Sequence, residues 1–367
     1  MSTISIPRYP TDVTASWLAA VLDARGHSVD VRDVDVVPIG TGQTGATYRV
    51  TATYGANPVG LPDTFVIKLP AQDDTVRDRV TMGYRAECAF YAHVADQVQV
   101  PTPQWFHCEI TEDAAEYALL LADQSPAVQG DQLAGCGEAE ARLAVAAIAG
   151  LHGPTWQDPV WLDFTGIAFQ RPDKATAEGM GEVARISVDL TLEKLGERLG
   201  PTDSDTFSTA MGLVAPWLLA EHDRFALMHG DYRLDNMLFD PESTRVSVVD
   251  WQTLGVGLPA RDLAYFIATS LQPELRGALE RDLVDDYHRH LLAYGVQDYD
   301  RETCWRDYRL GMPQVLLISA FGFAFAAGTE RGDEMVLTML RRGCQAIREL
   351  GTIELLEEIA ASQRAAI

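Results

Sequence analysis

The chain has 367 residues, of which 47% are hydrophobic and 22% are charged. These proportions are those of an ordinary globular protein, and the length allows two packed domains or one large one. The formal net charge of −24 repels phosphate backbones and anionic membranes, so we expect no nucleic-acid partner and no membrane partner. Five scattered cysteines without a C-x-x-C pair predict neither a disulfide framework nor a zinc site.

Targeting signals are not apparent in the sequence. The first ten residues contain no basic region followed by an apolar run, so we expect no signal peptide and a cytoplasmic location. The most apolar stretch, residues 315–328, is shorter than the roughly 20 residues that span a bilayer. It therefore predicts a buried helix. The sequence does not indicate an oligomeric state.

The first third of the chain alternates strand and helix signals. An amphipathic pattern predicts a helix over 14–25, ending at Gly26. Runs rich in Val, Thr and Tyr predict strands, and a longer run predicts a second helix. The expected strands are 31–37, 46–54, 65–69 and 117–121, and the second helix is 75–97.

Beyond about residue 124 the chain reads as mainly helical. Expected helices are 138–152, 204–221, 262–271, 279–294, 304–327 and 333–350, with only two short strands at 237–239 and 246–249. We therefore predict an α+β protein with a small N-terminal lobe, residues 1–123, and a larger helical lobe, residues 124–367. A cleft between two such lobes is a common ligand site.

The first chemical motif is a glycine loop at residues 40–45 that fits G-x-G-x-x-G. Its candidate nucleotide-binding residues are Gly40, Gly42, Gln43, Thr44 and Gly45. In a dinucleotide-binding fold such a loop opens a helix and an acidic residue follows about 20 positions later, where Asp63 stands. In kinases the loop joins two strands and covers the ATP phosphates. A plain hairpin turn is the third reading, and the motif alone leaves all three open.

Lys68 lies inside the apolar run 65–69, where an unpaired ammonium would be costly to bury. Nucleotide phosphates or a carboxylate on the next helix would neutralise it, and Glu87 is the candidate carboxylate. Such a strand lysine and helix glutamate form the ion pair that organises ATP in protein kinases. The alternative is a solvated edge lysine and a solvated glutamate.

The segment 227–239, with the sequence LMHGDYRLDNMLF, carries the strongest signal, and VSVVDWQ follows at 246–252. Phosphoryl transfer needs a carboxylate that orients the acceptor hydroxyl, and oxygen ligands for magnesium. Asp231 suits the first role, while Asn236, five residues later, and Asp250, at the end of an apolar strand, suit the second. A hairpin through 240–243 would bring Asn236 and Asp250 together.

These residues resemble the aminoglycoside phosphotransferase-like family. Its signature is His-Gly-Asp with Asn five residues after the Asp, then an apolar strand ending in Asp-Trp; here these are 229–231, Asn236 and 250–251. The resemblance covers residues from about 36 to 266 and implies a two-lobed protein-kinase-like fold, ATP and Mg²⁺ as cofactors, and a hydroxylated small molecule as substrate. It adds Leu121 as a nucleotide contact. The segment 119–123, with 130–132 beyond it, is most similar to the ecdysteroid kinase-like branch.

The motifs also differ from those of protein kinases. The chain has His-Gly-Asp and Asp-Trp-Gln in place of His-Arg-Asp and Asp-Phe-Gly, and no Ala-Pro-Glu follows, which disfavours a protein substrate. Acceptors that stay open are a steroid-like compound, an aminoglycoside and an amino alcohol. We expect His229 to be structural and Asp262 to brace the catalytic loop.

Two rival functions remain at this point. A nucleotide-binding pseudokinase with a regulatory role would keep the fold, although it would not need the complete set of Asp231, Asn236 and Asp250. A dinucleotide-dependent oxidoreductase is supported by the glycine loop alone.

Overall fold

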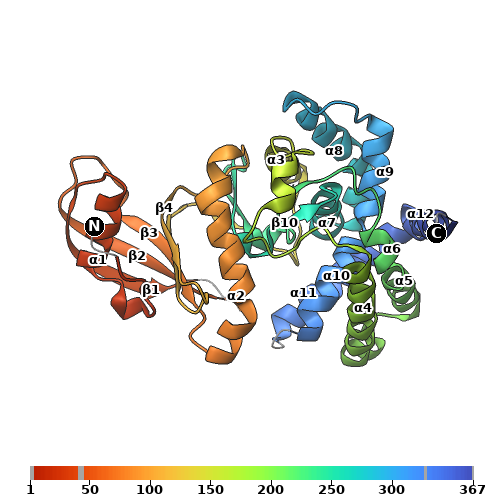
Figure 1. Cartoon of the computed structure of the whole chain (residues 1–367), viewed down its shortest axis with the longest axis horizontal. Helices are drawn as coiled ribbons and strands as arrows, with labels where there is room; N and C mark the ends of the chain where they lie inside the picture. The colour runs from red at the N-terminus through yellow and green to blue at the C-terminus, as the bar shows by residue number, and fades with distance from the viewer. Residues whose placement is uncertain (1–3, 40–44, 326–328, 366–367) are drawn as a thin grey trace.

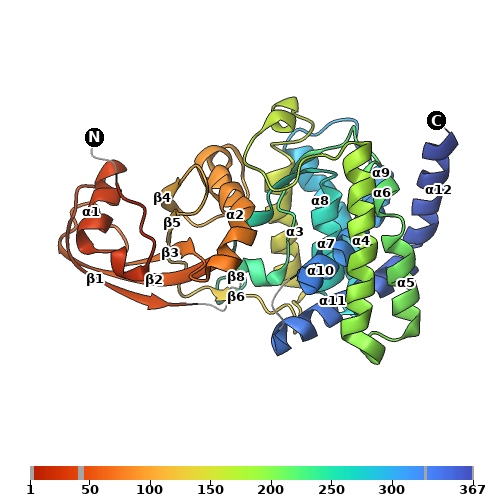
Figure 2. The ribbon, with the colours of Figure 1, turned by 60° about the horizontal axis from the view of Figure 1, so that its bottom comes forward.

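The computed structural model describes residues 4–39, 45–325 and 329–365. A strand-rich part and a helical part lie at opposite ends of the molecule, with helix α2 (Asp74–Ala89) between them in both views (Figures 1 and 2). The predicted two-lobed α+β architecture is confirmed.

Five strands of the described chain form the N-terminal antiparallel sheet, in the order β1-β2-β3-β5-β4. Its strands are β1 (Asp30–Pro38), β2 (Gly45–Ala56), β3 (Thr64–Pro70), β4 (Trp105–Ile110) and β5 (Tyr117–Ala122). Strand β4 was not expected. Its alternation of apolar residues with His107 and Glu109 is the period-two pattern of a half-buried strand, a signal that the prediction missed.

The two faces of the sheet carry different partners. Helix α1 (Ala15–Ala24) packs on one face, in a cluster with Phe65, Ile67 and Leu69 of β3. Because side chains alternate along a strand, Lys68 lies on the opposite face. Tyr117 and Leu119 of β5 belong to the core cluster on that second face, together with Tyr84 and Cys88 of α2.

Helix α2 links the sheet to the C-terminal lobe. It continues through a π-helical turn, Phe90–Val94, and a 3-10 turn, Ala95–Gln97, so the helical run expected over 75–97 is present with a changed geometry at its end. The ring of Phe90 stacks on Trp251 with centroids 3.6 Å apart and planes 4° apart. This stack fixes the end of α2 against the chain that follows Asp250.

Helix α7 lies at the centre of the C-terminal lobe, and all of its residues are buried. Helices α3, α8, α9, α10 and α11 pack against it. The helices of this lobe are α3 (Glu138–His152), α4 (Lys174–Leu195), α5 (Pro201–Met211), α6 (Val214–Leu218), α7 (Ala260–Ser270), α8 (Pro273–Ala293), α9 (Arg301–Gly311), α10 (Pro313–Phe325), α11 (Glu330–Glu349) and α12 (Thr352–Ala365).

Short strands position the loops of the lobe. Strands β6 (Val128–Gln129), β8 (Met237–Phe239) and β9 (Val246–Val248) form one small sheet, while β7 (Ala226–Met228) pairs with β10 (Gly255–Gly257). The expectation of only two short strands was therefore wrong. Strands of two or three residues are too short to show a periodic pattern.

Two helices expected as continuous are broken. The helix expected over 304–327 is α9 followed by α10, because Pro313 has no N–H and its ring disfavours helix before it. The helix expected over 204–221 is α5 followed by α6, separated at Gly212 and Leu213. Helices α4 and α12 were not expected. No helix of the described chain is long and apolar enough to cross a membrane.

A close contact between two helices of the lobe gives a stability test. A Cβ at Gly311 would stand 2.5 Å from the Ala260 carbonyl oxygen and 2.8 Å from the Ala264 Cβ, so α9 and α7 touch through backbone. We expect Gly311→Ala to lower the free energy of unfolding by about 2 kcal/mol through overpacking. Urea denaturation measures the change.

Gly277→Ala is the matched control. A Cβ at Gly277 in α8 meets no atom within 4 Å, so this change should raise the free energy of unfolding by about 0.5–1 kcal/mol through helix propensity. Equal stability of the two variants would contradict the described packing of α9 on α7.

Candidate active site

Lys68 lies between carboxylates from both lobes. Its Nζ is 2.6 Å from Glu87 Oε1 of α2 and 3.6 Å from Asp250 Oδ1. Glu87 is fully buried, and the Tyr117 hydroxyl donates to its Oε2 at 3.0 Å. Burial by itself lowers the pKa of Lys68, but Asp250 and Glu87 outweigh burial and raise the pKa above its ordinary value. The ammonium is therefore charged, and the solvated alternative for Lys68 and Glu87 does not apply.

The segment after β7 is held by one carboxylate of α7. Asp262 Oδ2 accepts the His229 N–H at 2.6 Å, and its Oδ1 accepts the Gly230 N–H at 2.9 Å. Gly230 has φ +84°, and a Cβ there would stand 2.4 Å from the Thr253 carbonyl oxygen. Only glycine fits this turn without strain. Asp231 directly follows the turn, so the turn sets the position of its backbone.

His229 is a structural residue, as expected. The Asp231 N–H donates to its Nδ1 at 3.3 Å, and its Nε2 lies 3.0 Å from the Val249 carbonyl oxygen. Because an amide N–H can only donate and a carbonyl can only accept, Nδ1 is the bare nitrogen and Nε2 carries the proton. The neutral ring thus connects the segment 227–239 to the residue that follows β9.

A second buried histidine supports Asp262 from behind. His152, the last residue of α3, places Nε2 3.2 Å from Asp262 Oδ2 and Nδ1 2.8 Å from the Tyr287 hydroxyl. Burial lowers the pKa of His152 more than Asp262 raises it. The hydrogen bonds of Asp262 therefore connect the segment 227–239 with α7, and through His152 and Tyr287 with α3 and α8.

Asp231 is surrounded by donors. The Tyr265 hydroxyl donates to its Oδ1 at 2.8 Å, and Asn236 Nδ2 donates to its Oδ2 at 3.0 Å. The single Nε–H of Arg233 is shared between both oxygens at 3.0 Å each. Arg233 also donates from Nη1 to Asp235. Hydrogen bonds from three residues thus restrict the orientation of the Asp231 carboxylate.

Asn236 and Asp250 are brought together by the hairpin of β8 and β9, as predicted. The Val249 N–H donates to the Asn236 carbonyl oxygen at 3.0 Å. The Asn236 Nδ2 donates to both the backbone oxygen and the Oδ2 of Asp231, which leaves its Oδ1 as the ligand atom. Asp250 has left-handed backbone geometry, with φ 67° and ψ 68°.

The oxygens of this pair suit a hard cation. Asp250 Oδ1 forms an ion pair with Lys68 Nζ at 3.6 Å but has no hydrogen-bond partner in the described structure, so this oxygen could also coordinate a cation. No cluster of three or more His, Cys, Asp or Glu side chains that could hold a metal occurs among the described residues. A metal here would take Asn236 and Asp250, with the remaining positions for water and phosphate oxygens, as magnesium prefers.

The glycine loop is placed by its flanking strands. Gly40, Gly42, Gln43 and Thr44 lie outside the described residues. Gly45 opens β2, opposite Pro70 of β3, and β1 ends at Pro38. A strand therefore follows the loop where a dinucleotide-binding fold would have a helix, and the arrangement is the one expected of a kinase loop. Leu121 is buried in β5, where it pairs with Val66.

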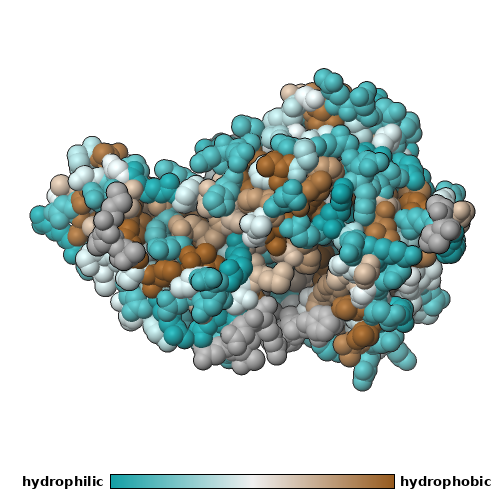
Figure 3. Space-filling view, in the orientation of Figure 1, coloured by the Kyte–Doolittle hydropathy of each residue, from teal (hydrophilic) through white to brown (hydrophobic). Residues whose placement is uncertain are grey.

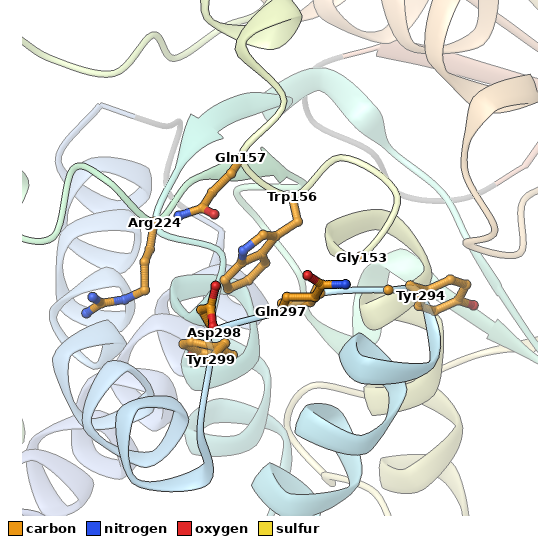
Figure 4. Close-up of a pocket in the computed structure, with 10 residues that line it drawn as sticks. Gly153, Trp156, Gln157, Arg224, Tyr294, Gln297, Asp298 and Tyr299 are labelled. Carbon is orange, nitrogen blue, oxygen red and sulfur yellow. The ribbon is translucent and has the colours of Figure 1, made fainter.

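A separate cavity of about 440 Å³ lies at the end of α3. Figure 4 shows Trp156 and Tyr299 in it, with ring centroids 4.7 Å apart, and none of the predicted site residues lines it. Near this cavity in the sequence, the rings of Trp161 and Phe164 pack edge to face with their centroids 5.5 Å apart. The surface of the molecule is notched between the sheet end and the helical end (Figure 3).

Residues 35–302 match the family model described as the phosphotransferase enzyme family. The chain belongs to this family. The resemblance to aminoglycoside phosphotransferases is thereby confirmed at the level of the family, and so is the prediction of a small-molecule kinase. The finer placement in the ecdysteroid kinase-like branch stays a prediction.

Solved structures with the same fold agree with this assignment. A Plasmodium vivax ethanolamine kinase has a TM-score of 0.55 at 13% identity, covering 86% of this phosphotransferase and 84% of that chain. A Ralstonia eutropha protein provisionally assigned as an aminoglycoside phosphotransferase has a TM-score of 0.53 at 16% identity, covering 90% and 98%. At these identities the likeness shows the fold.

A curated relative matches over a short stretch. Mouse acyl-CoA dehydrogenase family member 10 is 35% identical over 116 residues, which make up 27% of this chain and 10% of the relative. The phosphotransferase thus spans about a tenth of that relative's length, and the relative's name carries no activity over to it.

The Asp262 brace generates a prediction. Asp262→Asn would turn one acceptor oxygen into an NH₂ group that faces a backbone or ring N–H. We expect the free energy of unfolding to fall by about 2 kcal/mol or more, since a buried donor is left without an acceptor. Urea denaturation measures the loss. Asp189→Asn, on an exposed position of α4, should change stability by less than about 0.5 kcal/mol. A similar small change for Asp262→Asn would contradict the brace.

Proposed function

We propose that this phosphotransferase moves the γ-phosphate of ATP to a hydroxyl of a small molecule, with Mg²⁺ as cofactor. The observation that carries the proposal is the approach of Lys68 Nζ and Asp250 Oδ1 to 3.6 Å, with that oxygen otherwise unpartnered. A phosphate-binding cation and a metal-binding carboxylate are the two charges that a nucleotide triphosphate with magnesium requires.

The lobes have separate tasks in this proposal. Residues 1–123 bind ATP, through the loop 40–45, through Leu121 and through Lys68, which Glu87 holds toward the phosphates. Residues 124–367 supply the metal ligands Asn236 and Asp250. ATP supplies the phosphoryl group when bound, and Mg²⁺ neutralises charge on it.

Asp231 acts on the acceptor. Its carboxylate accepts a hydrogen bond from the substrate hydroxyl, orients that oxygen for attack and takes its proton as the new P–O bond forms, while the bond from the γ-phosphorus to the bridging oxygen breaks and ADP leaves. Arg233 forms an ion pair with this carboxylate, through one Nε–H shared between both oxygens at 3.0 Å each. Catalysis here rests on positioning and charge neutralisation.

Different features of the chain support different classes of acceptor. The net charge of −24 supports a cationic acceptor, such as an amino alcohol or an aminoglycoside, and an ethanolamine kinase shares the fold. The segment similar to the ecdysteroid kinase-like branch supports a steroid-like alcohol. A panel of ethanolamine, choline, kanamycin and a hydroxysteroid covers these chemistries. The complete Asp231, Asn236 and Asp250 set argues against a pseudokinase.

Asp231→Asn tests the role of the base. We expect magnesium-dependent ADP formation with the best acceptor of the panel to fall at least about 100-fold, because a neutral amide cannot take the proton. ATP affinity measured by calorimetry should stay within about twofold, since Lys68 and Asp250 are intact. Asp189→Asn, on an exposed position of α4, is the matched control and should turn over like wild type. Near-normal turnover of Asp231→Asn would remove Asp231 from this role.

A further inference from the structure

Helix α7 contacts the catalytic segment through one face. Asp262 and Tyr265 lie three residues apart on this helix, so their side chains leave the same face. Asp262 holds the backbone of the segment at His229 and Gly230, whereas Tyr265 reaches the carboxylate of Asp231. A helix buried along its whole length thus fixes both the loop and its reactive side chain.

The contact from Tyr265 is well defined. Its hydroxyl lies 2.8 Å from Asp231 Oδ1, and the residue is 1% exposed. Burial raises the pKa of Tyr265, and the charge of Asp231 raises it further. The hydroxyl therefore keeps its proton at neutral pH and can only donate to the carboxylate.

The other donors do not replace this contact. Asn236 donates to Oδ2, and the Arg233 Nε–H is divided between the two oxygens. Without the Tyr265 hydroxyl, Oδ1 would keep only the shared contact from Arg233 among the described residues. The rotation of the carboxylate about its Cβ–Cγ bond would then be limited only by Asn236 at Oδ2 and by the ion pair with Arg233 among the described residues.

We propose that Tyr265 is a positioning residue that sets the orientation of the Asp231 carboxylate toward the acceptor hydroxyl. This inference rests on the proposed function, because it assigns Asp231 the task of orienting the acceptor. Small errors in the placement of a catalytic group cost large factors in rate. The ATP contacts from Lys68 and Asp250 do not involve Tyr265, so nucleotide binding is independent of it.

Tyr265→Phe removes the hydroxyl and keeps the ring. We expect kcat for magnesium-dependent ADP formation, with the best acceptor of the panel, to fall by about 10- to 100-fold. The KM for ATP should change by less than about twofold, because the lost contact acts after ATP is bound. A loss of folded protein would also lower the apparent kcat at unchanged KM, so kcat is expressed per folded enzyme, with the folded fraction measured by circular dichroism. A lower kcat per folded enzyme at unchanged KM then indicates positioning.

Tyr308→Phe is a closely matched control. The Tyr308 hydroxyl is fully buried and donates to a carboxylate, Glu280 Oε2, at 2.9 Å, but between α9 and α8. Burial and Glu280 raise the pKa of Tyr308, as burial and Asp231 do for Tyr265. Tyr308→Phe should lower the thermal midpoint as much as Tyr265→Phe does, with kcat within about twofold of wild type.

The outcomes distinguish a failure of the proposed function from a failure of the role proposed for Tyr265. If wild type binds no ATP with magnesium and forms no ADP with any acceptor of the panel, the proposed function fails and this inference fails with it. If wild type is active and Asp231→Asn is inactive, but Tyr265→Phe matches Tyr308→Phe in kcat, only the positioning role of Tyr265 is overturned. A selective loss of kcat in Tyr265→Phe supports it.

Discussion

The ammonium group of Lys68 lies where water cannot freely hydrate it, and this one charge constrains much of the surrounding structure. Burying it is costly unless carboxylates approach closely. Glu87 comes from α2 and Asp250 from the chain after β9, so the charge joins the sheet, the linking helix and the helical lobe. The stack of Phe90 on Trp251 holds the same two segments together through apolar contact.

A second carboxylate organises the other side of the site. Asp262 accepts two backbone N–H groups and contacts the ring of His152, so the segment 227–239 is fixed to a helix whose residues are all buried. The hydrogen bond from Asn236 to Asp231 connects the two halves, since Asn236 also lies on the hairpin that ends near Asp250. The proposed nucleotide side and the proposed acceptor side are thus held by separate carboxylates, and Asn236 connects them. This arrangement allows the two sides to be probed independently by substitution.

What the sequence could predict follows from the range of each signal. Strands such as 65–69 and the pair 237–239 and 246–249 show local patterns, and β3, β8 and β9 lie there. The pairing of Lys68 with Glu87 was predictable because the order of motifs follows a known family. Tyr117 and Tyr265 carried no signal of their own, because their partners lie 30 and 34 residues away in sequence. Tyr265 stands three residues after Asp262, and the helix predicted over 262–271 already places both on one face.

The central claim is that Asp250 and Lys68 form a magnesium-dependent nucleotide site, and calorimetry tests it most directly. ATP is titrated into wild type and into Asp250→Ala, each with and without magnesium. The account predicts binding to wild type that requires magnesium and is weakened at least about tenfold by the substitution, since the metal loses a charged ligand. No nucleotide binding to wild type under any condition, or binding that neither magnesium nor Asp250→Ala affects, would contradict it.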